Sequence, residues 1–188
     1  AFALLARAAS PAQIHALLPR RSCFSRQAAG ERQVEQIVAA NIDTVFLVSG
    51  LDANYNPKRI QRFFVAARDS GAQPVIILNK SDLCDDPDSV RREIELLVPG
   101  IPVVITSTFT RKGLKALAET YALPGRTLAF VGSSGAGKST LINRLLKDAE
   151  AMPTGEVREK DGKGRHTTTR RELTATPTGA LVIDTPGM

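Results

Sequence analysis

Eight residues in the C-terminal half of the chain fit a phosphate-binding loop, G-x4-G-K-[ST]: Gly132, Ser133, Ser134, Gly135, Ala136, Gly137, Lys138 and Ser139, followed by Thr140. The glycines let successive backbone N–H groups curl around phosphate oxygens, and a following helix adds partial positive charge. Lys138 would bring a cation to the β- and γ-phosphates, and the Ser139 hydroxyl would ligate Mg²⁺. Because an apolar run precedes the loop and a helical pattern follows it, the spacing favours this interpretation over an accidental glycine-rich turn.

A second motif predicts which base the nucleotide carries. Asn79, Lys80, Ser81 and Asp82 have the N-K-x-D form and follow an apolar run. A carboxylate at Asp82 can accept both donors on the edge of guanine, whereas adenine would leave that charge unpaired, at a cost of several kcal/mol. Asn79 can join this loop to the phosphate loop, and the aliphatic stem of Lys80 can lie over the base. Ser107 and Thr108 follow the next apolar run, where their backbone would contact the guanine oxygen.

Two further segments would sense the γ-phosphate. Asp184-Thr185-Pro186-Gly187 matches D-x-x-G, so Asp184 would hold a Mg²⁺-bound water and the Gly187 N–H would contact the γ-phosphate. The other switch is expected in the sequence GRHTTT, where Thr168 or Thr169 would reach the phosphate and Mg²⁺; the spacing does not choose between them. Residues 158–171 carry six basic and two acidic side chains, which fits a solvated mobile loop or an RNA contact.

Catalysis needs a group that orients the attacking water. Many GTPases place a glutamine directly after D-x-x-G, and this chain has Met188 there, which cannot make the required hydrogen bond. His166 is the candidate for that role, beside Lys138, Thr168, Thr169 and Gly187 as catalytic residues. We therefore expect slow turnover unless a partner stimulates it.

The composition fits a compact protein with surplus positive charge. Of 188 residues, 43% are hydrophobic and 23% are charged, with a net charge of +6. Such a surplus favours polyanionic partners such as nucleic acid. No run approaches the roughly 18 apolar residues of a membrane span. Cys23 and Cys84 form no C-x-x-C pair, so we expect reduced thiols rather than a disulfide framework or a zinc site.

The motifs need a parallel sheet to position them. Short apolar runs predict strands at Thr44–Val48, Pro74–Leu78, Val103–Thr106, Thr127–Val131 and Leu181–Ile183, with Glu172–Thr176 as a half-exposed partner of the last. Helical patterns cover Lys58–Arg68, Val90–Val98, Leu114–Tyr121 and Ser139–Lys147. The alternation predicts an α/β fold, a mostly parallel sheet with helices on both faces. Within residues 1–30 the pattern indicates one strand, Ile14–Leu18.

The order of the motifs is permuted, because N-K-x-D precedes the phosphate loop and D-x-x-G comes last. With this order the chain resembles the family of ribosome small-subunit-dependent GTPase A, also called RsgA or YjeQ, over roughly residues 14–188. The resemblance is carried by five segments: Ala39–Asp43, Asn79–Asp82, Gly132–Thr140, Gly164–Thr169 and Asp184–Met188.

The resemblance implies a circularly permuted P-loop GTPase that cleaves the β–γ phosphoanhydride of GTP, uses GTP/GDP and Mg²⁺, and works in the cytoplasm without a membrane. It also implies that the protein matures the small ribosomal subunit, binds 16S rRNA and is stimulated by the ribosome; we expect a monomer. Residues 1–30 would be the end of the family's OB-fold barrel plus a linker, and 31–188 the GTPase domain. The zinc ligands of the family's C-terminal domain have no counterpart in this chain, so we expect a fragment or a protein that lacks much of the family's RNA-docking apparatus.

Two alternatives stay open beside this interpretation. The chain could be a guanine-nucleotide-dependent RNA or ribosome binding module with negligible turnover by itself, which Met188 favours. It could also be an ATP-using P-loop kinase or transport ATPase, against which Asn79–Asp82 argues.

Overall fold

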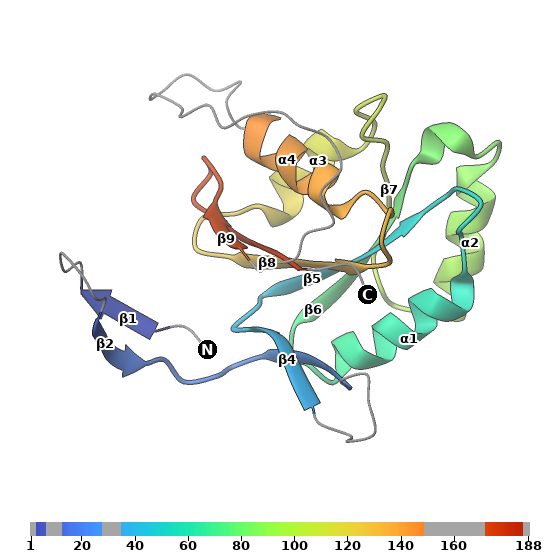
Figure 1. The fold of residues 1–188 in the computed structure, drawn as a ribbon. Coiled ribbons are helices and arrows are strands. Elements are labelled where there is room, and N and C mark those ends of the chain that lie inside the picture. The colour runs from blue at the N-terminus through green and yellow to red at the C-terminus, as the bar shows by residue number, and fades with distance from the viewer. Residues whose placement is uncertain (1–2, 7–12, 28–34, 149–171, 186–188) are drawn as a thin grey trace.

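The computed structural model describes residues 3–6, 13–27, 35–148 and 172–185. A six-stranded sheet forms its centre, with the strand order β7-β6-β5-β8-β10-β9 (Figure 1). Its strands are β5 (Thr44–Gly50), β6 (Gln73–Asn79), β7 (Val103–Ile105), β8 (Thr127–Gly132), β9 (Glu172–Ala175) and β10 (Leu181–Asp184). The helices are α1 (Pro57–Arg68), α2 (Pro87–Leu97), α3 (Leu114–Tyr121) and α4 (Lys138–Asp148), with a 3-10 turn η1 (Ser81–Leu83).

The expected α/β fold is confirmed. Strands β7, β6, β5, β8 and β10 pair in parallel. Strand β9 pairs with β10, as expected for residues 172–176, and the structure shows that this pairing is antiparallel. The largest difference among the helices is at α2, which begins at Pro87 instead of Val90. The Asp86 side chain caps that end by accepting a hydrogen bond from the Ser89 N–H at 2.9 Å, so proline occupies the first turn, where its missing N–H costs nothing.

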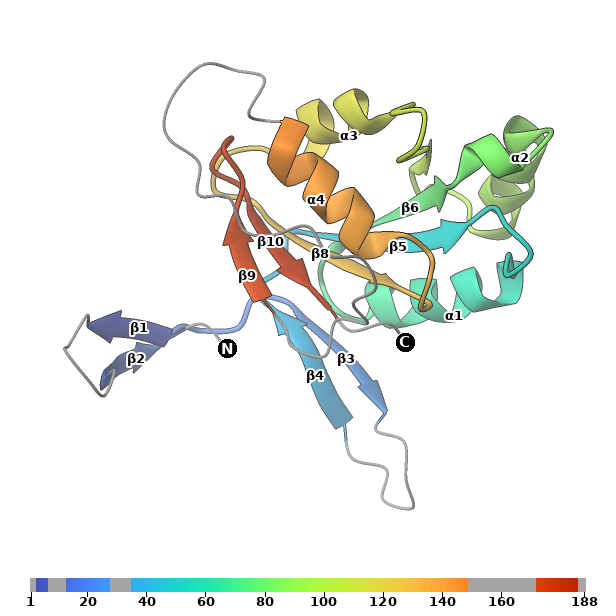
Figure 2. The same ribbon diagram turned by 45° about the horizontal axis from the view of Figure 1, so that its top comes forward.

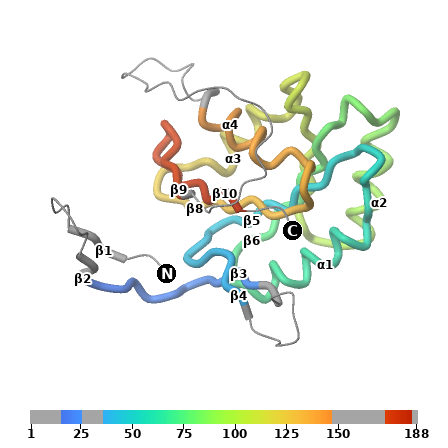
Figure 3. Tube along the Cα trace, in the orientation of Figure 1, coloured from blue at the N-terminus to red at the C-terminus, as the bar shows by residue number. Residues whose placement is uncertain are grey.

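Every residue from Val45 to Val48 of β5 is apolar, so this strand has apolar side chains on both faces of the sheet. Helices cover both faces. Val45 and Leu47 point into one buried cluster, together with Ile60 of α1 and Ile94 of α2. The alternate residues point to the opposite face, where a second cluster includes side chains of α3 and α4. Figures 1 and 3 show α3 and α4 on the side of the sheet opposite α1, and Figure 2 shows α4 crossing β8 and β10.

Two antiparallel ribbons precede the sheet: β1 (Ala3–Ala6) with β2 (Gln13–Leu17), and β3 (Cys23–Gln27) with β4 (Glu35–Ala40). The sequence pattern indicated only β2 in this part of the chain. The other three strands were missed because two-stranded ribbons need no long apolar run, and their pairing is decided by tertiary contacts. Phe24 of β3 is buried in the same cluster as Val45. The domain boundary expected at residue 30 stays a prediction, and it falls between β3 and β4.

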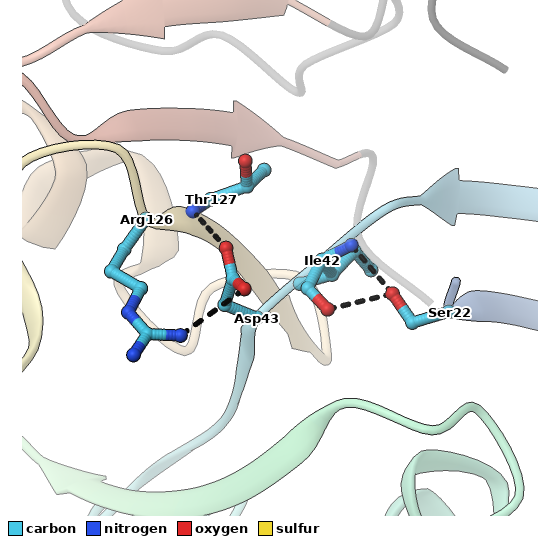
Figure 4. Close-up of polar contacts among 5 residues, drawn as sticks. All are labelled: Ser22, Ile42, Asp43, Arg126 and Thr127. Carbon is cyan, nitrogen blue, oxygen red and sulfur yellow. Dashed lines mark hydrogen bonds and ion pairs between the residues drawn. The ribbon is translucent and has the colours of Figure 1, made fainter. Parts of the chain in front are cut away.

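A junction of polar contacts joins the β3–β4 ribbon to the sheet (Figure 4). The buried Ser22 hydroxyl donates to the Ile42 carbonyl and accepts from the Ile42 N–H, both at 2.6 Å. Asp43 then accepts from the Thr127 N–H at 2.8 Å and pairs with Arg126 at 3.3 Å. Since Thr127 begins β8, the same corner fixes the start of the strand that leads to the predicted phosphate loop.

Candidate functional site

The predicted motifs meet at one edge of the sheet. Strands β7, β6, β5, β8 and β10 are parallel neighbours in that order, so their carboxyl ends lie side by side. The N-K-x-D motif begins at Asn79, the last residue of β6, and the phosphate loop begins at Gly132, the last residue of β8. Ser107–Thr108 comes after β7, and Asp184 ends β10. The structure therefore brings the base-reading and phosphate motifs together although they lie far apart in the chain.

The phosphate loop is shaped by close backbone approaches. A Cβ on Gly132 would lie 2.2 Å from the Val48 carbonyl oxygen of β5. Gly135 and Gly137 adopt positive φ angles of 77° and 93°, which glycine tolerates without a steric penalty. Ser133 is half-buried and Ser134 is exposed, while Thr140 lies exposed on α4.

Lys138 opens α4 and is buried against its own loop. Its ammonium donates to the carbonyl oxygens of Gly132 and Ser133, each at 2.9 Å. Burial lowers the pKa of Lys138 below its usual range, and the nearby negative charge of Asp184 opposes that shift. The charged side chain is thus held against its own loop, beside the start of a helix, where an anionic ligand would offset its lost hydration.

A hydroxyl and a carboxylate lie together beside the phosphate loop. Ser139 Oγ donates to Asp184 Oδ2 at 3.3 Å, and both residues are half-buried. Oxygen ligands of this kind suit Mg²⁺, which usually takes one or two protein ligands and completes its shell with phosphate and water. The pair could hold that ion, whose charge would offset the negative charge of bound phosphates.

Asn79 joins the two halves of the site. Its side chain is fully buried; Nδ2 donates to the Ala136 carbonyl of the phosphate loop at 3.0 Å, and Oδ1 accepts from Thr106 Oγ1 at 3.1 Å. A Cβ on Gly137 would lie only 2.3 Å from Asn79 Nδ2, so glycine is required for this approach. The structure thereby contains the link between loops expected from the N-K-x-D motif. Thr106 was missed by the sequence analysis, since a buried threonine at a strand end carries no motif.

Asp82 is held in place by the loop after β7. Ser107 Oγ donates a hydrogen bond to Asp82 Oδ1 and accepts from the Thr110 N–H at 3.0 Å. The sequence pattern predicted a backbone role for Ser107 and Thr108 and gave no indication of this side-chain contact. Ser81 is buried and donates its N–H to the Thr106 carbonyl at 3.1 Å, which fixes the turn that presents Asp82.

Lys80 has a partner from a third loop, which the sequence analysis also missed. Its ammonium lies 2.6 Å from Asp52 Oδ2, in the segment that follows β5. The contact lowers the pKa of the Asp52 carboxyl, chiefly through the hydrogen bond from Lys80. Asp52 belongs to no recognised motif, and 28 positions separate the partners.

Several predicted residues lie outside the described part of the chain. These are the switch candidates and their neighbours: His166, Thr167, Thr168, Thr169, Gly187 and Met188. Thr185 is described, and its buried hydroxyl donates to the Phe130 carbonyl of β8, which fixes the chain directly after Asp184.

The described residues contain neither a cluster of metal-ligating side chains nor a helix that could span a membrane. No group of three or more His, Cys, Asp or Glu side chains suited to a metal ion occurs among the residues that the structure describes, so the zinc expected for the family stays a prediction. Within that same part of the chain, none of the helices has the length and apolar character that crossing a membrane requires.

Comparisons with known proteins agree with this geometry. The chain is 53% identical over 175 residues to a protein of Opitutus terrae named small ribosomal subunit biogenesis GTPase RsgA, covering 93% of this chain and 47% of the relative. The protein of that name from Syntrophotalea carbinolica is 48% identical, covering 94% of this chain and 50% of its own length. The chain thus spans about half the length of the curated relatives it matches.

Solved structures show the same fold. The crystal structure of YjeQ from Thermotoga maritima superposes with a TM-score of 0.65 at 29% identity, covering 94% of this chain and 55% of that one. A structure described as YloQ, a circularly permuted GTPase, gives a TM-score of 0.62 at 24% identity, covering 98% and 55% of the two chains. The fold is therefore that of a circularly permuted GTPase. The family model described as RsgA GTPase matches residues 17–188, and with nearly the whole chain inside that match, the chain belongs to this family.

Proposed function

We propose that this chain binds GTP and GDP with Mg²⁺ and hydrolyses the β–γ phosphoanhydride of GTP. The observation that carries the proposal is the hydrogen bond between Asn79 and Ala136, which joins the base-reading loop to the phosphate loop. With that link in place, Asp82 and Lys138 can act on the two ends of one nucleotide. The pairing of Ser107 with Asp82 supports guanine as the base, since it holds the carboxylate ready for two donors.

We further propose that the protein acts in maturation of the small ribosomal subunit, as a cytoplasmic monomer that binds 16S rRNA. The names of the relatives support the subunit as partner, and the net charge of +6 supports binding to a polyanion. His166, Thr168, Thr169 and Gly187 keep their proposed catalytic roles. Slow turnover in isolation and stimulation by the subunit remain the expected behaviour.

Base recognition is tested by comparing affinities for GTP and ATP, and then by Asp82→Asn. The unaltered chain should prefer GTP on the order of a thousandfold. In the variant, an amide NH₂ can donate to the 2-oxo group of xanthine, so affinity should move from guanosine to xanthosine nucleotides. Asp85→Asn makes the same charge change at an exposed position three residues further on and should leave the preference intact. Equal binding of GTP and ATP would overturn the proposal.

Turnover is tested by measuring phosphate release with small ribosomal subunits, with large subunits and alone. Stimulation by small subunits only is the expected result. Guanine-specific binding without release under any of the three conditions would instead favour the alternative, a nucleotide-dependent binding module.

A further inference from the structure

The contact between Lys80 and Asp52 adds a third loop to the base-reading site. Gly50 of β5 lies opposite Asn79 of β6 in the parallel register, and the Leu51 N–H donates to the Asn79 carbonyl at 2.7 Å. The segment after β5 is therefore fixed against the start of the N-K-x-D turn. Asp52 comes directly after that fixed point.

The Asp52 carboxylate is organised by contacts on both oxygens. Oδ1 accepts from the Asn54 N–H at 3.0 Å, and Oδ2 accepts from Lys80 Nζ at 2.6 Å. The Asp52 carbonyl accepts from the Tyr55 N–H at 2.8 Å, which closes the turn. Asp52 is therefore held in one orientation by its own loop.

Lys80 is constrained from the other side. Its backbone has a φ of 61°, in the left-handed region, and its carbonyl accepts from the Leu83 N–H at 3.0 Å. A Cβ on Gly50 would lie 3.3 Å from Lys80 Cδ and 3.2 Å from Asp52 Oδ2, so glycine leaves the room in which the two side chains meet. The lysine side chain is 29% exposed and that of Asp52 19% exposed, so water screens the pair less than it would on an open surface.

A lysine stem that lies over a base must first be ordered. Lysine has four rotatable side-chain bonds and loses more conformational entropy on fixation than most residues. A partner that holds the ammonium end in advance reduces that loss at the moment of binding. We propose that Asp52 is a positioning residue for guanine-nucleotide binding: it anchors Lys80 so that the lysine stem forms one wall of the base pocket. This inference rests on the proposed function.

Contact of the Lys80 stem with the face of the base and recognition of the base edge by Asp82 should affect nucleotide affinity in different ways. Contact between an aliphatic stem and a flat base does not depend on the donors and acceptors of the base edge. Loss of the Asp52 anchor should therefore weaken all nucleotides by a similar factor and leave the ratio of GTP to ATP affinity unchanged. Asp82→Asn, in contrast, should change that ratio.

The test is a double-mutant cycle on the 188-residue chain, with GDP affinity measured by titration calorimetry. Asp52→Asn removes the charge but keeps an oxygen that can accept from the Asn54 N–H, and should weaken GDP about threefold to tenfold. Lys80→Met keeps an unbranched stem without the ammonium. In that background, Asp52→Asn should change GDP affinity less than about 1.5-fold. Asp85→Asn is the matched control for the loss of one negative charge at this edge.

Each outcome has a distinct meaning. If Asp52→Asn binds GDP as tightly as the unaltered chain, or if its effect persists in the Lys80→Met background, the positioning role is overturned. If the unaltered chain shows no preference for guanine nucleotides, the proposed function fails first. A chain with guanine preference and an additive cycle would lose only the inference about Asp52.

Discussion

The buried hydrogen bonds of Asn79 allow the joint between the two loops to be tested quantitatively. Asn79 and Thr106 are each 0% exposed, and Ala136 is also buried. Asn79→Ala would leave two buried polar atoms without their partners, the Ala136 carbonyl oxygen and the Thr106 hydroxyl. Each such atom costs about 1–3 kcal/mol, so the free energy of unfolding should fall by about 2–6 kcal/mol.

Thr106→Val tests one of these bonds separately. Valine keeps the shape of threonine and removes the hydroxyl, which leaves Asn79 Oδ1 unpaired and should cost about 1–3 kcal/mol. In the double variant both partners of this bond are gone, so neither the Thr106 hydroxyl nor Asn79 Oδ1 is left unpaired. The combined loss should therefore be smaller than the sum of the single losses by about 2–3 kcal/mol.

The assay is urea unfolding followed by circular dichroism, without added nucleotide. Asn54→Ala, at an exposed position in a neighbouring loop, is the control and should change the unfolding free energy by less than about 0.5 kcal/mol. Strictly additive losses, or a loss below about 1 kcal/mol for Asn79→Ala, would show that these bonds do not hold the site together.

Three other substitutions have defined outcomes. Gly137→Ala would force a Cβ against the Asn79 side chain at a φ of 93°, so GDP affinity in titration calorimetry should fall by about tenfold or more. Unchanged affinity would show that the close contact between Gly137 and Asn79 is not needed for binding. Tyr55→Phe removes a buried hydroxyl that has no hydrogen-bond partner among the described residues, and whose burial raises the Tyr55 pKa to about 12. Its unfolding free energy should stay equal or rise by up to about 1 kcal/mol in urea titrations, whereas a clear loss would contradict this account. Ser22→Ala removes both bonds to Ile42 and should lower the unfolding free energy by about 1–2 kcal/mol, measured as a lower Tm; an unchanged Tm would show that the junction adds nothing.

The sheet and its motifs could be predicted because their signals are local. Strands buried on both faces, such as β5 and β8, are short continuous apolar runs, and each motif directly follows one of them. The start of α2 was placed too late because the apolar positions begin at Val90. The cap residue Asp86 and the proline at position 87 mark the boundary, although neither belongs to the apolar face of the helix.

The residues that were missed depend on contacts between distant parts of the chain. Asp52 acquires a role only because β5 and β6 are neighbours in the sheet, which brings its loop against Lys80. Thr106 likewise matters through a bond to Asn79, 27 positions earlier. Phe24 looks like an isolated aromatic in a polar stretch, and only the packing of β3 against the main cluster explains its burial. Composition and periodicity contain none of these pairings.

The permuted order of the motifs still allows one shared site because the site depends on strand order in space. Strand β5 lies between β6 and β8, yet Asn79 at the end of β6 reaches Ala136 beyond β8. For the Asn79 side chain to reach Ala136, the residues between them at this edge of the sheet must be small. The chain has glycine at the end of β5, at the end of β8 and at position 137. Glycine at these points and an asparagine long enough to span one strand satisfy the geometry whichever loop comes first in the chain. A permutation that kept the strand neighbours would therefore preserve the contact between Asn79 and Ala136, whereas a single Cβ at position 137 would disturb it.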